Sequence, residues 1–276
     1  MNRPYAGLAL LTDLDGTLLR PDKTVAPEDA AAIADFRANG GLFSFATGRG
    51  QQASQAYLEL FQPDFPVVMY NGALLMDPKT GQSAGAEYLP AEARALLEEL
   101  AAAFPDVGAE VLHPEGVFVF QDSEVERTHL RVTNVPFVMR TLDEANPADC
   151  YKALFAGTPE RIAEMHEYIK KARFSQINFT RSHECFLEIL PPDTNKGTAL
   201  EKIRRTLPDG MKICATGDFD NDAAMLLTAD YCGCPADSQP AVLDAVRQSG
   251  GYISPKTCAD GFFAAWVENV LEHFAR

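Results

Sequence analysis

Residues 8–17 read LALLTDLDGT, and this stretch decides the fold prediction for the chain. A short apolar run that ends at a turn signal is typical of a buried strand. In an extended segment, residues two apart point the same way, so Asp13 and Asp15 are expected to face one site together. Two carboxylates held this close require a cation or a shared proton. The carboxyl end of such a strand is also where open α/β sheets place their chemistry.

The acidic turn at Asp13–Gly16 also matches two other kinds of structure, a calcium-binding loop and a plain solvated turn. An EF-hand calcium loop needs Gly at its sixth position and Glu at its twelfth. Counted from Asp13, those positions hold Leu18 and Thr24, which excludes the EF-hand. A plain solvated turn stays open for any isolated Asp-x-Asp-Gly, but the strand pattern before it favours a functional site.

The totals exclude several classes of protein. The chain has 276 residues, 46% of them hydrophobic, and a formal net charge of −15. That charge argues against nonspecific binding to nucleic acid and against docking on anionic membranes. The sequence shows neither a signal peptide nor an apolar run of about 18 residues that would span a membrane. The six cysteines are scattered without zinc spacing, so reduced thiols and a cytoplasmic location are expected.

Alternating elements predict the architecture. A helix from Pro27, a strand over 42–46, a helix over 51–61 and a strand over 66–70 follow the first strand, which predicts right-handed crossovers and a parallel sheet. Residues 82–190 change to helices with paired strands, including strands at 174–180 and 185–190, as in an α+β unit with one helical layer. Residues 191–276 return to the first pattern. We therefore expect a discontinuous α/β core (1–81 and 191–276) with an inserted α+β cap domain (82–190).

Three later segments carry polar residues at predicted strand or helix ends. Thr47-Gly48-Arg49 offers a hydroxyl, backbone amides and a helix start, which suits a phosphate. Lys196 opens a helix, where the macrodipole disfavours a cation. Gly217-Asp218-Phe219-Asp220-Asn221-Asp222 gathers three acids and an amide at a strand-to-helix turn, which makes a hard-cation site plausible. Asp220 is expected to face solvent.

These four segments, in this order, resemble the four motifs of the haloacid dehalogenase superfamily of phosphotransferases. The likeness spans the whole chain and is closest to Cof-type members of subfamily IIB. About thirty residues separate the first two motifs, and the insertion falls between the second and third, as in relatives with an α+β cap. Asn71-Gly72-Ala73 after the third strand is similar too. The resemblance implies a Rossmann-like core.

The resemblance also implies the role of each site residue. Asp13 would attack phosphorus and form an aspartyl phosphate, while Asp15 would act as general acid and base. Thr47, Gly48 and Lys196 would bind the phosphate, and Lys196 would neutralise charge on Asp13. Mg²⁺ would be held by Asp13, Asp218, the backbone carbonyl of Asp15 and, directly or through water, Asp222. The remaining candidates, for substrate contact or support, are Asn221, Arg49 and Asn71.

The expected activity is Mg²⁺-dependent hydrolysis of a small phosphorylated metabolite, a sugar phosphate or a similar phosphomonoester. A dehalogenase would lack the carboxylate that Asp15 supplies. A phosphosugar mutase and a non-catalytic phosphometabolite-binding protein remain as alternatives. Neither nucleic acid nor a membrane is an expected partner, and the sequence leaves the oligomeric state open. The candidate cap residues for substrate contact are His113, Arg131, Arg140 and His183.

Overall fold

The first strand, β1 (Leu8–Thr12), is completely buried near the middle of a five-stranded sheet in this computed structural model, which describes residues 3–172 and 176–275. Its two neighbours, β2 (Leu42–Phe45) and β12 (Lys212–Thr216), both run parallel to it. β13 (Tyr231–Cys234) and β14 (Tyr252–Ile253) complete the order β14-β13-β12-β1-β2, again in parallel. The parallel sheet predicted from the alternation of elements is therefore confirmed.

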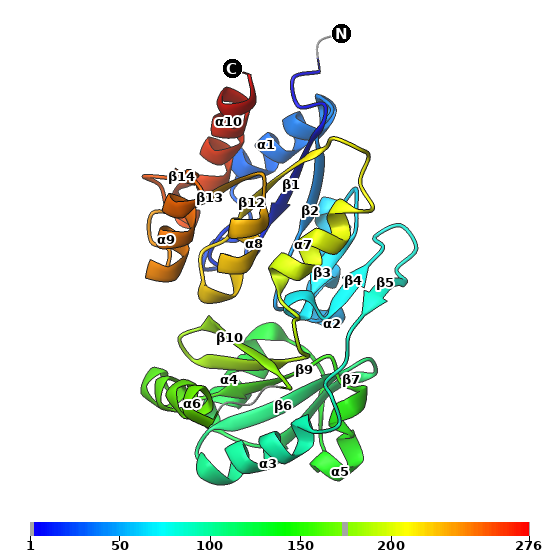
Figure 1. Cartoon of the computed structure of the whole chain (residues 1–276), viewed down its shortest axis with the longest axis vertical. Helices are drawn as coiled ribbons and strands as arrows, with labels where there is room; N and C mark the ends of the chain where they lie inside the picture. The colour runs from blue at the N-terminus through cyan, green and yellow to red at the C-terminus, as the bar shows by residue number, and fades with distance from the viewer. Residues whose placement is uncertain (1–2, 173–175, 276) are drawn as a thin grey trace.

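Helices cover both faces of this sheet, as Figure 1 shows. On one face, β1 residues such as Leu10 pack in a cluster with α1 (Pro27–Ala38), α2 (Gln51–Phe61) and α10 (Phe262–Phe274). On the other face, Leu11 packs with α7 (Lys196–Arg204), α8 (Ala223–Thr228) and α9 (Pro240–Gln248). The two faces of β1 are both apolar because a doubly covered parallel strand has no solvent side.

The third predicted strand lies at the margin of the core. β3 (Val67–Met69) meets β2 through a single parallel bridge between Ala46 and Val68. It otherwise forms an antiparallel three-stranded sheet with β4 (Leu74–Met76) and β5 (Ser83–Ala86). The turn η1 (Tyr70–Gly72) joins β3 to β4, and Asn71 in this turn has a left-handed backbone with φ of 55°.

The inserted segment forms its own six-stranded sheet, in the order β10-β11-β9-β6-β7-β8. These strands are β6 (Gly108–His113), β7 (Gly116–Gln121), β8 (Phe137–Met139), β9 (Lys152–Ala156), β10 (Asn178–His183) and β11 (Phe186–Leu190). All pairs are antiparallel except β7 with β8. This sheet lies below the core in Figure 1 and confirms the α+β cap.

Helices lie on both faces of the cap sheet. α3 (Ala93–Ala103) and α6 (Pro159–Ala172) cover one face, with the short α5 (Leu142–Ala145) beside them. α4 (Glu124–Thr133) packs on the opposite face, where its Leu130 joins Leu112 and Leu154. The expectation of one helical layer is therefore wrong, because both faces of this sheet carry apolar residues. Residues 174 and 175 of the strand expected over 174–180 lie outside the described residues, and β10 starts at Asn178.

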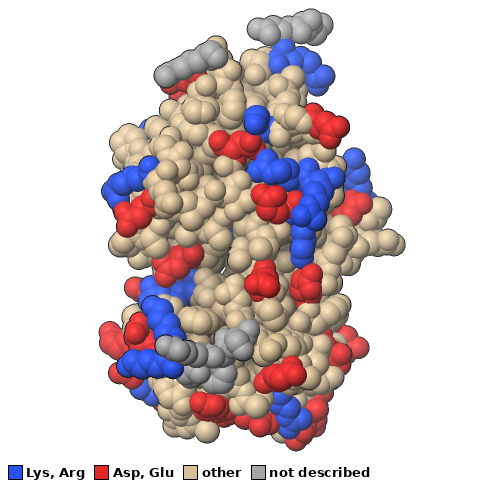
Figure 2. Space-filling view, in the orientation of Figure 1, with Lys and Arg blue, Asp and Glu red and all other residues tan. Residues whose placement is uncertain are grey.

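The division into 1–81, 82–190 and 191–276 remains a proposal. The hairpin of β4 and β5 crosses its first boundary, since β5 begins at Ser83 but pairs with β4. Among the described residues, no helix is both long and apolar enough to cross a membrane. All six cysteines are described, and each is free. On the face drawn in Figure 2, acidic and basic side chains are interspersed.

Candidate active site

The carboxyl ends of three parallel strands bring the predicted motifs together at the edge of the core sheet that faces the cap. Asp13 follows β1, Thr47 comes soon after β2, and Asp218 follows β12. Lys196 is the first residue of α7, capped by Asn195, whose side chain accepts a hydrogen bond from Thr198 N. Parallel strands end at one edge, so residues far apart in sequence converge there.

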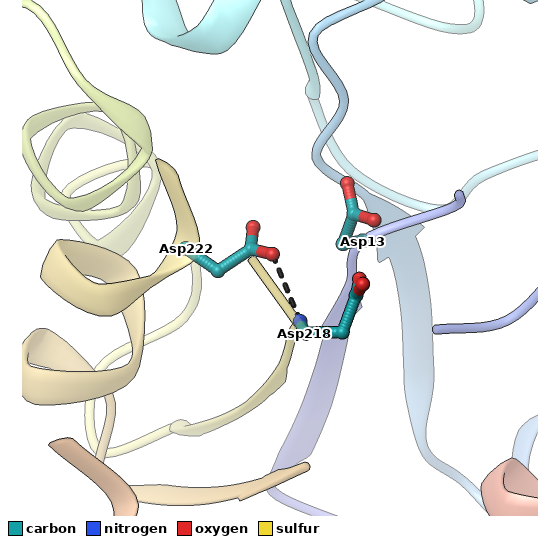
Figure 3. A group of neighbouring side chains, drawn as sticks. All are labelled: Asp13, Asp218 and Asp222. Atoms are coloured by element: carbon teal, nitrogen blue, oxygen red, sulfur yellow. Dashed lines mark hydrogen bonds between the residues drawn. The ribbon is translucent and has the colours of Figure 1, made fainter. Parts of the chain in front are cut away.

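Three carboxylates form the centre of the site. Asp13, Asp218 and Asp222 each offer an oxygen, and these oxygens lie within 4.8 Å of one another (Figure 3). Asp222 Oδ2 accepts a hydrogen bond of 3.0 Å from the backbone N–H of Asp218, drawn as the dashed line. Hard divalent cations take oxygen ligands of this kind, so the donor set fits Mg²⁺. Asp13 and Asp222 are buried, and Asp218 is partly buried.

Lys196 supplies a cation to this cluster. Its Nζ lies 2.5 Å from Asp13 Oδ1 and 2.6 Å from Asp222 Oδ1, with no exposed side-chain surface. Burial opposes the charge on Lys196, but Asp13 and Asp222 outweigh burial and raise its pKa. Burial raises the pKa of Asp13, which Lys196 opposes and Asp222 reinforces. Burial, with Asp222 second, also raises the pKa of Asp218 to about 7. The cluster therefore carries more carboxylate than one ammonium can neutralise, which favours an added cation.

Two residues of the first motif, Gly16 and Thr17, contact the Asp218 carboxylate and fix its position. Thr17 Oγ1 donates a hydrogen bond of 2.7 Å to Asp218 Oδ1. Gly16 has a φ of +81°, and a Cβ there would clash with the Asp218 carboxylate. Only glycine therefore suits this close approach.

The Asp15 carboxylate is occupied by two basic side chains. Arg49 binds it through two hydrogen bonds, of 2.6 Å from Nε and 2.7 Å from Nη2, and Lys23 Nζ adds one of 2.7 Å. Burial opposes ionisation, but Arg49 and then Lys23 outweigh it and lower the pKa of Asp15 to about 2. The Asp15 side chain lies outside the acidic triad. Its predicted contact with metal concerned the backbone carbonyl only.

The predicted phosphate loop, Thr47-Gly48-Arg49, lies beside Asn71. Thr47 is buried, and its Oγ1 accepts a hydrogen bond of 3.1 Å from Arg49 N. Asn71 and Asn221 are joined directly, with Asn221 Nδ2 donating to Asn71 Oδ1 at 2.9 Å. A Cβ at Gly48 would lie 3.1 Å from Asn71 Nδ2, so the loop and the asparagine are in contact.

Sequence reasoning missed Lys152 and Glu188, two cap residues that contact this part of the core. Lys152 Nζ donates to Gly48 O at 2.7 Å, and Glu188 Oε2 accepts from Asn71 Nδ2 at 2.7 Å. A signal existed, because both are charged residues inside otherwise apolar strands. Asp220 also departs from expectation. It pairs with Arg181 of the cap at 3.3 Å instead of facing solvent alone, because the cap approaches the loop that carries it.

A cavity of about 440 Å³ lies between the core and the cap. Asp13, Asp15, Thr47, Gly48 and Arg49 line its core end. Its cap walls are largely apolar and aromatic, and include Leu112, Val117, Leu130, Leu154, Phe186, His113, His129 and His183, with Glu110 among them. Of the candidate cap residues, His113 and His183 line the cavity. Arg140 instead lies over the Phe118 ring, 4.0 Å from its centroid, and Arg131 is exposed.

A family model for haloacid dehalogenase-like hydrolases matches residues 10–264. The chain belongs to this family. It is 29% identical over 235 residues to the HMP-PP phosphatase of Serratia proteamaculans, covering 79% of this chain and 80% of the relative. It is 26% identical to the 5-amino-6-(5-phospho-D-ribitylamino)uracil phosphatase YitU of Bacillus subtilis, over 94% and 95% of the two chains.

The fold matches the solved structure of BT4131, a sugar phosphatase of haloacid dehalogenase subclass IIB. The TM-score is 0.78 at 18% identity, and the match covers 97% of this chain and 98% of that one. The predicted resemblance to the haloacid dehalogenase superfamily is confirmed, and the fold agrees with that of a subclass IIB structure. Family membership and the phosphatase relatives also confirm the expectation of a haloacid dehalogenase-type phosphomonoester hydrolase.

Proposed function

We propose that this haloacid dehalogenase-like hydrolase is a Mg²⁺-dependent phosphatase that hydrolyses a small phosphorylated metabolite through an aspartyl-phosphate intermediate. The observation that carries the proposal is the contact of the buried Lys196 ammonium with Asp13, inside a triad of carboxylates. A carboxylate with a fixed cation beside it can approach a phosphoryl group, because the cation offsets the repulsion between the two anions.

In the proposed first step, an Asp13 carboxylate oxygen attacks phosphorus and the bond from phosphorus to the leaving oxygen breaks. Asp15 donates a proton to that leaving oxygen. In the second step, Asp15 takes a proton from water, the water oxygen attacks phosphorus, and phosphate and free Asp13 are released. Arg49 and Lys23 keep Asp15 ionised, so the first step also requires that substrate displaces at least one of them.

Asp13, Asp218 and Asp222 are the side chains that would hold Mg²⁺, with the Asp15 backbone carbonyl as a further ligand. When bound, Mg²⁺ neutralises charge on the transferring phosphoryl oxygens and orients them. Thr47 Oγ1, the Gly48 N–H and Lys196 Nζ are the proposed donors to the same oxygens. Thr47 and Gly48 line the cavity beside Asp13, and Lys196 reaches the nucleophile directly.

The cavity supports a small substrate. Its volume of about 440 Å³ suits a metabolite, and its walls lie mostly on the cap. The similar proteins include phosphatases for HMP-PP, for a phosphoribitylaminouracil and for a sugar. A sugar phosphate or a similar phosphomonoester is the proposed substrate class. We include neither nucleic acid nor a membrane among the proposed partners, because the net charge of −15 disfavours both. The free cysteines support a proposed cytoplasmic location.

Hydrolysis of p-nitrophenyl phosphate tests the proposal. Activity is expected with Mg²⁺ and not after chelation with EDTA. Asp13→Asn is expected to lower kcat by about 1,000-fold or more, because it removes the nucleophile. Acid quenching of the wild type with ³²P-labelled substrate should trap label on the protein, and Asp13→Asn should trap none. Full activity of a folded Asp13→Asn variant would contradict the assignment. A panel of phosphorylated metabolites then identifies the substrate.

A further inference from the structure

Lys152 and Glu188 form a buried ion pair on the cap. They lie on the neighbouring strands β9 and β11, with Lys152 Nζ 2.5 Å from Glu188 Oε2. Both side chains are only 2% exposed. Leu154, two residues after Lys152, lines the cavity, so this face of the cap sheet is turned toward the core.

The same two side chains also bind the core. Lys152 Nζ donates to the carbonyl of Gly48, in the loop after β2. Glu188 Oε2 accepts from Asn71 Nδ2, and Asn71 Oδ1 accepts from Asn221 Nδ2. The other oxygen of Glu188 accepts a hydrogen bond from the Ser182 hydroxyl. Each donor meets an acceptor, so the charge on Glu188 fixes which way the Asn71 amide points.

These contacts reach the backbone of the proposed phosphate loop. The peptide between Gly48 and Arg49 is held at both ends: its carbonyl accepts from Lys152, and its N–H donates to Thr47 Oγ1 at 3.1 Å. The position of this peptide therefore fixes the Thr47 hydroxyl. The second set of contacts runs from Glu188 through Asn71 to Asn221, which lies in the loop between Asp218 and Asp222. The ion pair thus contacts the phosphate loop directly through Gly48 and is linked to the Asp218–Asp222 loop through Asn71.

Stability alone explains the pair poorly. A buried ion pair contributes little net stability, because desolvation of both charges offsets their attraction. Both side chains lie at the wall of the cavity, yet each exposes only 2% of its surface, so little water reaches the pair. Burial of the Lys152 ammonium is costly, and the ammonium donates to the Gly48 carbonyl. A role in positioning the loop therefore explains the pair better than a contribution to the stability of the fold.

We propose that the Lys152–Glu188 ion pair positions the phosphate loop and the Asn71–Asn221 pair, and does so only while the cap lies on the core. The proposal rests on the proposed phosphatase function. When the cap moves away, Gly48 and Asn71 lose their cap partners together, so the site is complete only in the closed arrangement. Lys152 and Glu188 are positioning residues, since they act through Gly48 and Asn71.

Lys152→Met and Glu188→Gln test this in the full-length protein with p-nitrophenyl phosphate and Mg²⁺. Each is expected to lower kcat by about 10- to 100-fold, as is usual for residues that orient catalytic groups. KM should change by less than about threefold, because the lost contacts matter most in the transition state. Inhibition by orthovanadate, a transition-state mimic, should weaken by a factor similar to the loss in kcat. Inhibition by inorganic phosphate should stay nearly unchanged.

Arg181→Gln is the matched control. It removes another ion pair between cap and core, Arg181 with Asp220, whose side chains are 22% and 31% exposed and which does not touch the phosphate loop. Its kcat should stay within about threefold of the wild type, as for most exposed ion pairs. The double variant Lys152→Met/Glu188→Leu leaves no unpaired buried charge, so it should fold even where a single variant does not. It should show the same loss in kcat.

Several results would overturn the proposal. One is a Lys152 or Glu188 variant that folds and keeps the wild-type kcat. A second is a loss of kcat in Arg181→Gln as large as in those variants. A third is a loss of kcat in those variants without weaker inhibition by vanadate. Failure of all three Lys152 and Glu188 variants to fold would also overturn it, because the pair would then be a stabilising element. An inactive wild type would instead contradict the proposed phosphatase function. Thermal unfolding of every variant establishes which case applies.

Discussion

Lys196 Nζ lies 2.5 Å from Asp13 Oδ1, in a position with no exposed side-chain surface. The same nitrogen lies 2.6 Å from Asp222 Oδ1, so one ammonium joins the proposed nucleophile to a proposed metal ligand. Because Lys196 is the first residue of α7, its backbone position is fixed by the helix start. This contact connects the first, third and fourth motifs.

The first prediction concerns Lys196→Met. Removing the ammonium leaves buried carboxylates unpaired, which should lower the free energy of unfolding by about 3 kcal/mol or more at pH 8 without Mg²⁺. The kcat for p-nitrophenyl phosphate should fall by about 1,000-fold. Chemical denaturation with and without Mg²⁺ measures the first effect. An Asp13→Asn/Lys196→Met double variant should recover stability, because it removes one of the unpaired charges; no recovery would count against the interpretation.

The second prediction is that Mg²⁺ affinity depends on pH. The pKa of Asp218 is raised to about 7 by burial and by Asp222, and a carboxylate must lose its proton to bind a metal. Apparent affinity should therefore increase as the pH rises toward 7. Isothermal titration calorimetry in buffers of different ionisation enthalpy should detect proton release below pH 7. Affinity that is independent of pH between 5.5 and 8 would contradict this.

The third prediction separates the role of Asp15 from that of Asp13. A general acid matters most when the leaving group is a poor one. Asp15→Asn should therefore lower kcat for an alkyl phosphate by about 100-fold more than for p-nitrophenyl phosphate, whose leaving group needs little protonation. Asp13→Asn serves as the control, since loss of the nucleophile should impair both substrates severely. Equal effects of Asp15→Asn on the two substrates would refute the general-acid assignment.

The fourth prediction concerns Gly16→Ala. Gly16 has a φ of +81°, and an added Cβ would collide with the Asp218 carboxylate. The variant should bind Mg²⁺ about 10-fold or more weakly, because a displaced ligand loses its geometry. Gly85→Ala is the matched control, since a Cβ there would meet nothing within 4 Å. Calorimetric titration of both proteins compares them directly, and unchanged affinity in Gly16→Ala would show that Asp218 is not a ligand.

The fifth prediction concerns stability in the cap. Burial, with Glu110 second, raises the pKa of Glu126 from 4.5 to about 10, so the folded protein keeps a proton that the unfolded chain releases. The contribution of Glu126 to stability is therefore fully present below pH 4.5 and falls as the pH rises toward 10. Glu126→Gln cannot ionise and has nearly the same shape.

The melting temperature of Glu126→Gln should therefore exceed that of the wild type by an amount that grows between pH 5 and pH 9. At pH 9 the excess should reach at least about 2 °C, which corresponds to roughly 1 kcal/mol for a chain of this size. Glu124→Gln, on the exposed side of the same helix, should show no such trend. A difference that stays constant with pH would contradict the buried, protonated state of Glu126.

Lys196, which begins a helix after the cap, was placed by its resemblance to the family's third motif. The convergence of Asp13, Thr47 and Asp218 could instead be predicted from the strand ends. The reason is local. An apolar run specifies a buried strand, parallel strands end at one edge, and the polar residues that follow them must meet there. The cap was predictable too, because its pairs of strands and helices differ in rhythm from the core.

Contacts across the cavity between residues of distant segments became known only from the three-dimensional packing. Arg49 and Lys23 reach Asp15, and Lys152 reaches Gly48, through the packing of loops and of cap against core. Periodicity along a chain specifies which face of a strand is buried, but not what lies opposite that face. Lys152 and Glu188 could be recognised in the sequence as charges within apolar strands. Their partners became known only once the cap was placed on the core.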